Sequence, residues 1–126
     1  MSTLTTISVV IPSIRPETTR RTLTYLLSTE VTPAEIIVVS DGYHDEFAEL
    51  CKELGVTHVE NEGKRQHHGR ITGLKRVTTE FVHLLDDDDY LNPSFYKNIE
   101  KHLRSNMIGL CLPSVCSYGK GMHLFN

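Results

Sequence analysis

Four consecutive aspartates, Asp86 to Asp89, are the residues of this sequence best suited to chemistry. Neighbouring carboxylates repel by about 1 kcal/mol at 4 Å in water and by about 4 kcal/mol at an effective dielectric constant of 20. Mn²⁺ or Mg²⁺ reverses this repulsion, because such hard cations take oxygen ligands and leave positions for water and phosphate. In an extended chain, Asp86 and Asp88 point to one side. Asp87 and Asp89 point to the other, so we expect only one or two of the four to bind the metal.

The alternative for this run is structural, a solvated turn that caps a helix beginning near Pro93. The run, however, directly follows the apolar segment Phe81 to Leu85, which is typical of a strand. Ligands of parallel sheets bind at the carboxyl ends of the strands. The position of the run therefore favours a metal site over a plain turn.

Two further polar segments lie at the ends of expected elements. The first follows an expected strand, and the second precedes an expected helix. Asp41, in Ser40-Asp41-Gly42, is either a helix cap or a carboxylate that accepts hydrogen bonds from the base or ribose of a nucleotide. The basic stretch from Gly63 to Arg70 is suited to phosphate contacts at a helix start. Its glycine spacing is not that of a P-loop, and no Ser or Thr follows Lys64.

The elements that must position these residues alternate along the chain between β-branched runs and helical periods. Strands are expected at residues 7–11, 36–39, 56–59 and 81–85, with a further one from Met107 to Leu112. Helical spacing is found in four sets, namely Leu23, Leu26 and Leu27, then Phe47, Leu50, Cys51 and Leu54, then Ile71, Leu74 and Val77, then Phe95, Ile99 and Leu103 with an end near Ser105-Asn106. This order predicts an α/β fold with a doubly wound, mainly parallel sheet and helices on both faces.

Length and charge narrow the function classes. The 126 residues are enough for one domain, which we expect to span 1–126. A net charge of −3 and a pI near 6.1 argue against nucleic acid as a partner. No apolar run approaches the roughly 20 residues of a membrane span, and no signal peptide is evident, so a cytoplasmic protein is expected.

Three segments resemble glycosyltransferases of family 2, which have the GT-A fold: Ile7 to Ser13, Glu35 to Gly42, and Phe81 to Asp89. The resemblance implies a Rossmann-like half that binds a nucleotide-sugar. Residue by residue, it implies donor-binding roles for Pro12, Ser13, Asp41, Arg70, Asp86 and Asp87. Asp86 and Asp88 match the Asp-x-Asp motif, which makes both metal ligands, with Asp88 foremost and Asp86 also near the ribose. Asp89 matches a further carboxylate of the family.

The sequence departs from the family pattern at several positions. Ile14 and Arg15 stand where the family has Tyr-Asn, and Ile71 replaces an asparagine after Arg70. The resemblance covers about the first 105 residues, so the acceptor-binding half is expected to be missing. No carboxylate lies between Met107 and Asn126, where the general base of the family would be sought. The catalytic base is therefore unassigned, and His123 is the only downstream group that titrates in a suitable range.

Two functions follow from these residues. The first is a metal-dependent transferase that moves a sugar from a nucleotide-diphosphate sugar to an acceptor hydroxyl, with inversion implied by the resemblance. The alternative is a truncated or degenerate module that binds a nucleotide-sugar without transferring it. A signalling receiver domain is disfavoured because Pro12-Ser13, rather than acidic residues, follow the first strand. The expected partners are the donor, an acceptor of unknown identity, and a second copy or another chain that completes the site.

Overall fold

The structure, a computed structural model, describes residues 2–101, 103, 115–117 and 123–125. Its elements are β1 (Ser2–Ser13), α1 (Pro16–Leu27), β2 (Val31–Ser40), α2 (His44–Leu54), β3 (Thr57–Glu60), α3 (Arg65–Leu74), β4 (Phe81–Leu84), α4 (Phe95–Glu100), β5 (Val115–Ser117) and β6 (His123–Phe125). The first four expected strands and the first three expected helices are thus found close to their expected positions.

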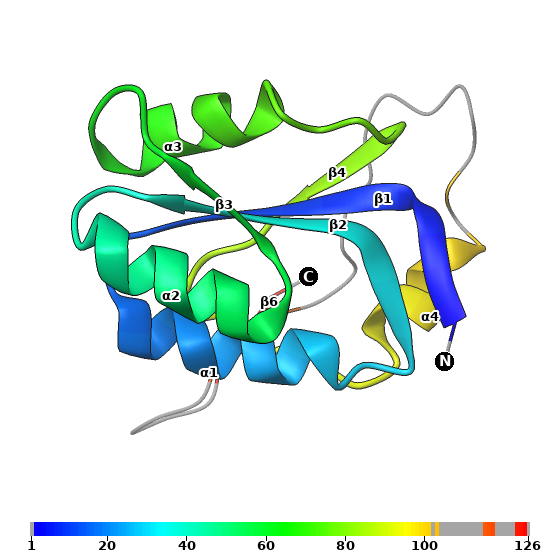
Figure 1. Cartoon of the computed structure of the whole chain (residues 1–126). Helices are drawn as coiled ribbons and strands as arrows, with labels where there is room; N and C mark the ends of the chain where they lie inside the picture. Colours follow the sequence, from blue (N-terminus) through cyan, green and yellow to red (C-terminus); the bar gives the residue numbers. More distant parts are fainter. Residues whose placement is uncertain (1, 102, 104–114, 118–122, 126) are drawn as a thin grey trace.

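The first four strands form one parallel sheet in the order β3-β2-β1-β4. Helix α3 covers one face, whereas α1, α2 and α4 lie on the other (Figure 1). The predicted doubly wound α/β architecture is therefore confirmed. Because the strand order reverses at β1, the carboxyl ends of β1 and β4 border the switch point where such sheets bind ligands.

The two faces of β1 belong to different cores. Val9 and Ile11 join a large apolar cluster with the helices α1, α2 and α4, while Val10 faces α3 in a small cluster with Ile37, Val39 and Val59. This alternation is the two-residue period of a strand that is covered on both sides. The sheet is thus packed much more heavily on one face than on the other.

Helices α1 and α2 form as their sequences predict. Pro16 occupies the first turn of α1, where its missing N–H costs nothing. Gly55 ends α2 in the left-handed conformation, with φ of 72° and its N–H bonded to the Cys51 carbonyl. Both helices bury the expected apolar side chains, including Leu23 and Leu26 in α1 and Phe47, Leu50 and Cys51 in α2.

The predicted apolar face of α3 is wrong. Ile71 and Leu74 are 40% and 41% exposed, and the helix instead buries Gly69, Thr72 and Gly73. A Cβ atom on Gly69 would lie 2.7 Å from the Pro12 Cβ, and one on Gly73 would overlap Val10 Cγ1. Close approach of the helix backbone to the sheet, rather than burial of large side chains, decides which face of α3 turns inward.

Helix α4 also differs from the prediction. It ends at Glu100 and buries Tyr96, while Phe95 and Ile99 are only partly buried. The Tyr96 hydroxyl lies 2.9 Å from His83 Nδ1, and this bond ties the helix to β4. The helix end expected near residues 105–106 and the strand expected over 107–112 lie outside the described residues.

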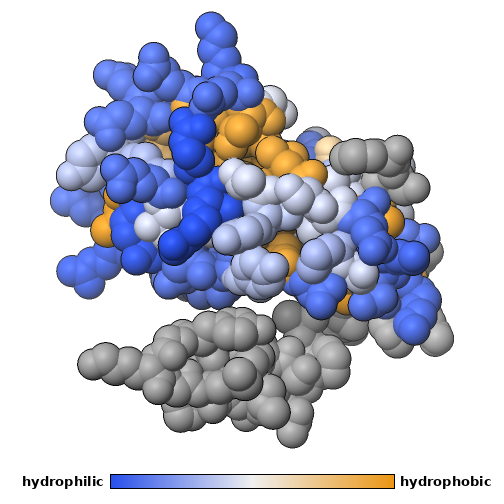
Figure 2. Space-filling model, turned by 90° about the horizontal axis from the view of Figure 1, so that it is seen from below, coloured by the Kyte–Doolittle hydropathy of each residue, from blue (hydrophilic) through white to orange (hydrophobic). Residues whose placement is uncertain are grey.

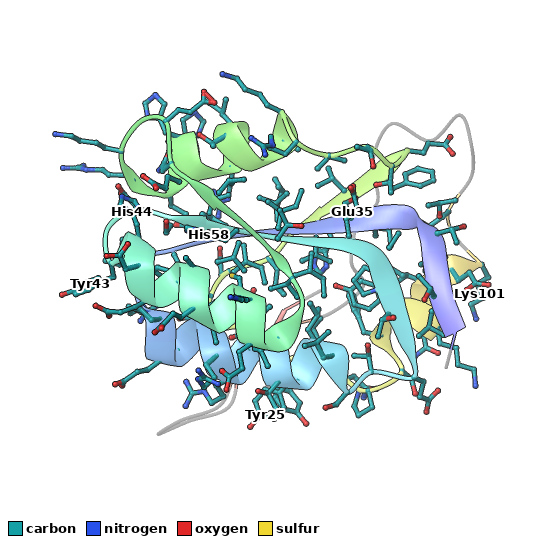
Figure 3. The ribbon with its side chains drawn as sticks, viewed as in Figure 1. Tyr25, Glu35, Tyr43, His44, His58 and Lys101 are labelled. Carbon is teal, nitrogen blue, oxygen red and sulfur yellow. The ribbon has the colours of Figure 1, made fainter. Side chains whose placement is uncertain are left out.

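Polar contacts fasten the amino-terminal side of the sheet. Ser8 Oγ donates to Glu35 Oε1 at 2.6 Å, and the Thr78 amide donates to the same oxygen at 2.9 Å (Figure 3). The bond from Ser8, followed by the bond from Thr78, lowers the pKa of Glu35. Glu35 therefore joins β2 to the connection between α3 and β4.

The side that carries α1 is largely hydrophilic, with a smaller area of apolar residues (Figure 2). Among the described helices, none combines the length and apolar character needed to cross a bilayer.

Candidate donor and metal site

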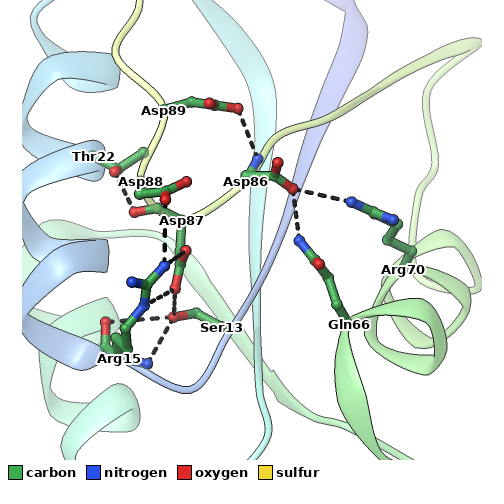
Figure 4. Close-up of polar contacts among 9 residues, drawn as sticks. All are labelled: Ser13, Arg15, Thr22, Gln66, Arg70, Asp86, Asp87, Asp88 and Asp89. Carbon is green, nitrogen blue, oxygen red and sulfur yellow. Dashed lines mark hydrogen bonds and ion pairs between the residues drawn. The ribbon is translucent and has the colours of Figure 1, made fainter. Parts of the chain in front are cut away.

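Predicted site residues follow the carboxyl ends of three strands, and Figure 4 shows Ser13, Arg70 and the four aspartates among them. Ser13 ends β1, Asp41 follows β2, and Asp86 to Asp89 follow β4. Backbone bonds hold these ends together, since the Asp41 N–H donates to the Ser13 carbonyl at 3.0 Å and the Leu85 N–H donates to the Val10 carbonyl at 3.0 Å. The sheet thus brings segments that are far apart in sequence to one edge.

Three of the four aspartates converge. Asp86, Asp88 and Asp89 each offer a carboxylate oxygen, and these oxygens all lie within 4.8 Å of one another. The segment is a turn rather than an extended strand, because the Asp89 N–H donates to the Asp86 carbonyl at 3.3 Å. The Asp86 N–H donates in return to Asp89 Oδ2 at 3.2 Å. The expectation that Asp89 would point away with Asp87 is therefore wrong, and Asp89 joins the cluster.

This cluster has the chemistry of a hard-cation site. Partial desolvation and the negative charges of Asp86, Asp88 and Asp87 raise the pKa of Asp89, against the opposing bond from the Asp86 amide. Mn²⁺ and Mg²⁺ prefer carboxylate oxygens, and a site with two or three of them leaves positions for a diphosphate. The donor set therefore fits either ion.

Asp86 is also held by two side chains of α3. Arg70 Nη2 donates to Asp86 Oδ1 at 3.0 Å, and Gln66 Nε2 donates to the same oxygen at 2.6 Å. These contacts need α3 close to the sheet, which Gly69 and Gly73 permit. Sequence reasoning found Arg70 but missed Gln66. The spacing of four between Gln66 and Arg70, and between the two glycines, is the signal that places each pair on one helix face.

Asp87 points away from the cluster and is 6% exposed. Ser13 Oγ donates to its Oδ2 at 2.5 Å. Arg15 donates to both of its oxygens, from Nε to Oδ2 at 3.1 Å and from Nη2 to Oδ1 at 2.5 Å. The hydrogen bonds to Asp87, followed by the charge of Asp87 and then that of Asp88, raise the pKa of Arg15 above its usual value. The structure thus joins Ser13 to Asp87, and a donor contact by either residue stays a prediction.

Asp41 does not cap α2. The N-cap of α2 is Tyr43, in the left-handed region with φ of 50° and without a side-chain cap. Asp41 Oδ2 instead accepts a bond of 2.6 Å from the Arg65 N–H at the start of α3. The helix-cap alternative is therefore wrong for α2, and one of the amides expected to serve phosphates is already paired with Asp41.

Two histidines brace the strand end before Asp41. Ser40 Oγ lies 2.6 Å from His44 Nδ1 and 2.8 Å from His58 Nε2, which joins β2 to α2 and β3 (Figure 3). Burial, with a smaller contribution from His44 and against the charge of Glu60, lowers the pKa of His58. The Ser40 hydroxyl has one proton, so it can donate to only one of the two ring nitrogens, and at least one imidazole donates its own N–H.

Two surface hollows lie elsewhere. One, of about 330 Å³, is lined by residues near the amino ends of β1 and β4, and the other, of about 780 Å³, lies between α1 and α2. Neither is lined by Asp41, Arg70 or the four aspartates. The donor set, rather than a hollow, identifies this edge as the candidate site.

Comparison with protein families decides the relationship of the chain. The family model described as Glycosyl transferase family 2 matches residues 8–124. The chain belongs to this family. The match to family 2 includes the acidic cluster, the strand ends and the basic helix α3. It confirms the resemblance predicted from the three segments.

Relatives of this family 2 chain include a curated protein and solved structures. The glycosyltransferase GlyA of Streptococcus pneumoniae serotype 4 is 24% identical over 125 residues, which is 94% of this chain and 18% of GlyA. The mannosyltransferase PcManGT of Pyrobaculum calidifontis, in complex with GDP-Man and Mn²⁺, superposes with a TM-score of 0.57 and 19% identity, over 68% of this chain and 28% of that one.

A second solved structure shows the same fold. Glucosyl-3-phosphoglycerate synthase of Mycobacterium tuberculosis, in complex with Mn²⁺, UDP and glucosyl-3-phosphoglycerate, has a TM-score of 0.57 and 20% identity, over 75% of this chain and 38% of that one. The family 2 chain thus shares its fold with transferase structures but spans much less than half the length of each of these relatives.

Proposed function

We propose that the chain binds a nucleotide-diphosphate sugar through Mn²⁺ or Mg²⁺ and transfers the sugar to an acceptor hydroxyl. The observation that carries this proposal is the convergence of Asp86, Asp88 and Asp89 within 4.8 Å, at the sheet edge that also holds Asp41 and Arg70. The two solved relatives, one in complex with GDP-Man and Mn²⁺ and the other with UDP and Mn²⁺, support the choice of ligand.

Each residue has a role in this proposal. Asp88, which is exposed, and Asp86 hold the cation, and Asp86 exchanges part of its contact with Arg70 for the donor. Bound there, the cation would neutralise the diphosphate as it leaves the sugar. Arg70 adds a positive charge beside the same phosphates. Its attraction for them strengthens in the transition state, because negative charge develops on the leaving group.

The nucleoside lies in this proposal against the ends of β1 and β2. Pro12 packs against Gly69 at the entrance, and Ser13 is held beside it by Asp87. Asp41 binds the base or ribose when it gives up the Arg65 amide. An exposed carboxylate in a short bond to a backbone N–H can exchange that partner for a ligand N–H at little cost.

A binding module that does not transfer sugar is the second candidate function. It needs no general base for an acceptor hydroxyl, a role to which no residue of this sequence is assigned. The acceptor, self-association or a completing partner chain, and a cytoplasmic location stay predictions under both candidates.

Asp88→Asn tests the metal assignment. The variant removes one charge from an exposed residue, so the fold is retained, while Mn²⁺-dependent binding of GDP or UDP is expected to weaken at least tenfold. Isothermal titration with and without Mn²⁺ measures the effect. Asp45→Asn, an exposed aspartate of α2 outside the cluster, is the matched control and should bind as the wild type does.

The outcomes separate the candidates. A wild-type chain whose GDP and UDP binding ignores Mn²⁺ would remove both candidates, and an Asp88→Asn variant that binds like the wild type would refute the ligand assignment. Release of free nucleotide from a panel of donor sugars, in the presence of Mn²⁺, favours the transferase, whereas binding without release favours the module.

A further inference from the structure

We propose that Arg15 and Asp87 form an anchor that positions the metal ligands, with Arg15 acting through Asp87. The inference rests on the proposed function of the aspartate cluster. It divides the four consecutive aspartates into three that face the cation and one that fixes the turn. Arg15 and Asp87 are thus positioning residues rather than ligands.

Both carboxylate oxygens of Asp87 are already used. Oδ1 accepts from Arg15 Nη2, and Oδ2 accepts from Arg15 Nε and from Ser13 Oγ. Two parallel bonds from one guanidinium form a charge-assisted fork, which fixes direction as well as distance. With 6% exposure and these three bonds, Asp87 has no oxygen free for a cation unless the anchor breaks.

The backbone of Asp87 is fixed as well. Thr22 Oγ1 of α1 donates to the Asp87 carbonyl at 2.5 Å (Figure 4). Side chain and carbonyl of Asp87 are therefore both bound to the β1 end and to α1. With residue 87 turned inward, the side chains of Asp86 and Asp88 emerge on the other side, where the turn brings Asp89 to them.

Because Arg15 is positively charged, a charge effect and a positioning effect predict opposite changes in cation affinity when Arg15 is removed. Arg15 Nη2 lies 3.6 Å from Asp88 Oδ2, so its positive charge alone opposes a cation at that carboxylate. If charge were its only influence, removing Arg15 would tighten cation binding. If Arg15 positions the turn, removing it weakens binding in spite of the lost repulsion.

The experiment measures Mn²⁺ affinity directly, from the electron paramagnetic resonance signal of free Mn²⁺, in wild type, Arg15→Met and Arg15→Lys. Residues that orient metal ligands typically contribute about 10- to 100-fold to metal affinity, and we expect a loss in this range for Arg15→Met. Arg15→Lys keeps the charge but loses the fork, so its affinity should also fall by about tenfold. Melting in EDTA confirms that each variant is folded at the temperature of the titration.

Arg20→Met is the matched control. Arg20 lies on α1, has the same 52% side-chain exposure as Arg15, and pairs with Glu53 at 2.6 Å, outside the cluster. It changes the net charge by the same amount and should leave Mn²⁺ affinity within about twofold of the wild type, since exposed charges at a distance are screened.

Each outcome decides a point. Equal or tighter Mn²⁺ binding by Arg15→Met overturns the inference, and wild-type affinity in Arg15→Lys does the same, because it would leave charge as the whole effect. If Arg15→Met does not fold, Arg15→Lys and Ser13→Ala carry the test with the same expected loss. A wild-type chain that takes up no Mn²⁺ rejects the proposed function, and the positioning role with it, whereas normal wild-type binding with unaffected variants rejects the positioning role alone.

Discussion

On one face of the sheet, α1, α2 and α4 bury large side chains such as Leu23, Phe47 and Tyr96. On the other face, α3 lies against β1 through Gly69 and Gly73, and the apolar cluster there has only four buried members. The first face removes far more apolar surface from water, which is the main source of stability in a domain of this size. The second face gives up that area and brings a helix backbone close to the sheet.

The close approach of α3 through Gly69 and Gly73 positions side chains at the site. Because α3 is close, its Gln66 and Arg70 reach Asp86, and the amide at its start reaches Asp41. Most of the apolar burial thus lies on one face, whereas the close approach of α3 on the other face serves the site, to which α1 adds the bond from Thr22 to Asp87. Substitutions on the two faces should accordingly differ in kind, and the following predictions test that division.

The largest effect is expected for Leu50→Ala on the heavily packed face. Leu50 is 3% exposed in α2, and truncating a buried leucine costs about 2–5 kcal/mol of unfolding free energy through lost burial and a cavity. Urea denaturation measures this loss. Mn²⁺ affinity of the folded protein should stay within about twofold of the wild type, since Leu50 lies in α2 and is not part of the acidic cluster.

Leu74→Ala is the matched comparison on the other face, with the same residue types in a helix but with 41% exposure. It should cost less than about 1 kcal/mol, as surface substitutions usually do. Equal losses from the two leucines would show that both faces carry stability alike, and the division would fail.

A second effect on the heavily packed face depends on pH. His83 is hydrogen-bonded to Tyr96, and burial lowers the pKa of His83 from the usual 6.5 to about 4. Above pH 6.5 the side chain is neutral in both the folded and the unfolded chain, so it adds no pH dependence. Between about pH 6.5 and pH 4 the unfolded chain binds a proton that the folded chain does not, so stability falls with pH by about 3 kcal/mol at most.

His83→Gln isolates this contribution, because glutamine keeps a hydrogen-bonding group for the Tyr96 hydroxyl and does not titrate. Unfolding free energies from urea titrations at intervals between pH 7.5 and pH 4 should decline less steeply in the variant. Parallel curves for wild type and variant would mean that His83 is protonated as easily in the folded chain as in the unfolded one.

The sequence predicts one face of this molecule better than the other. Apolar periods locate α1 and α2 and the residues they bury, because large side chains report burial directly. The same rule fails for α3, where the buried residues are Gly69, Thr72 and Gly73 and the exposed ones are Ile71 and Leu74. Glycine carries no hydropathy signal, so only the four-residue spacing of Gly69 and Gly73 marks the contact.

The site was predictable in position but not in detail. Strand ends of a parallel sheet must meet at one edge, which places Asp41 at the same edge as the aspartate run. The inward direction of Asp87 depends on bonds from Ser13, Arg15 and Thr22, which lie at least 65 residues away in sequence. Such long-range contacts decide that Asp89 rather than Asp87 joins the cluster, and no local pattern of four identical residues contains that information.

Gly73→Ala is expected to change stability less than Leu50→Ala does and, unlike Leu50→Ala, to affect the site as well. In an exposed helix this substitution stabilises by about 1 kcal/mol. Here the added methyl overlaps Val10, which is fully buried, so we expect a net loss of about 1–3 kcal/mol from overpacking. Moving α3 outward also lengthens the bonds from Gln66 and Arg70 to Asp86, so Mn²⁺-dependent GDP or UDP binding should weaken severalfold, as measured by calorimetry.

Gly55→Ala separates the two consequences. Gly55 has φ of 72° with open space around its missing side chain, so alanine there is strained by its backbone conformation and costs about 1 kcal/mol without displacing any neighbour. It ends α2, away from Asp86, and should leave nucleotide binding unchanged. If both variants lost stability and binding in the same proportion, weaker binding would follow from weaker folding in general. If Gly73→Ala alone loses binding, the close approach of α3 serves the site.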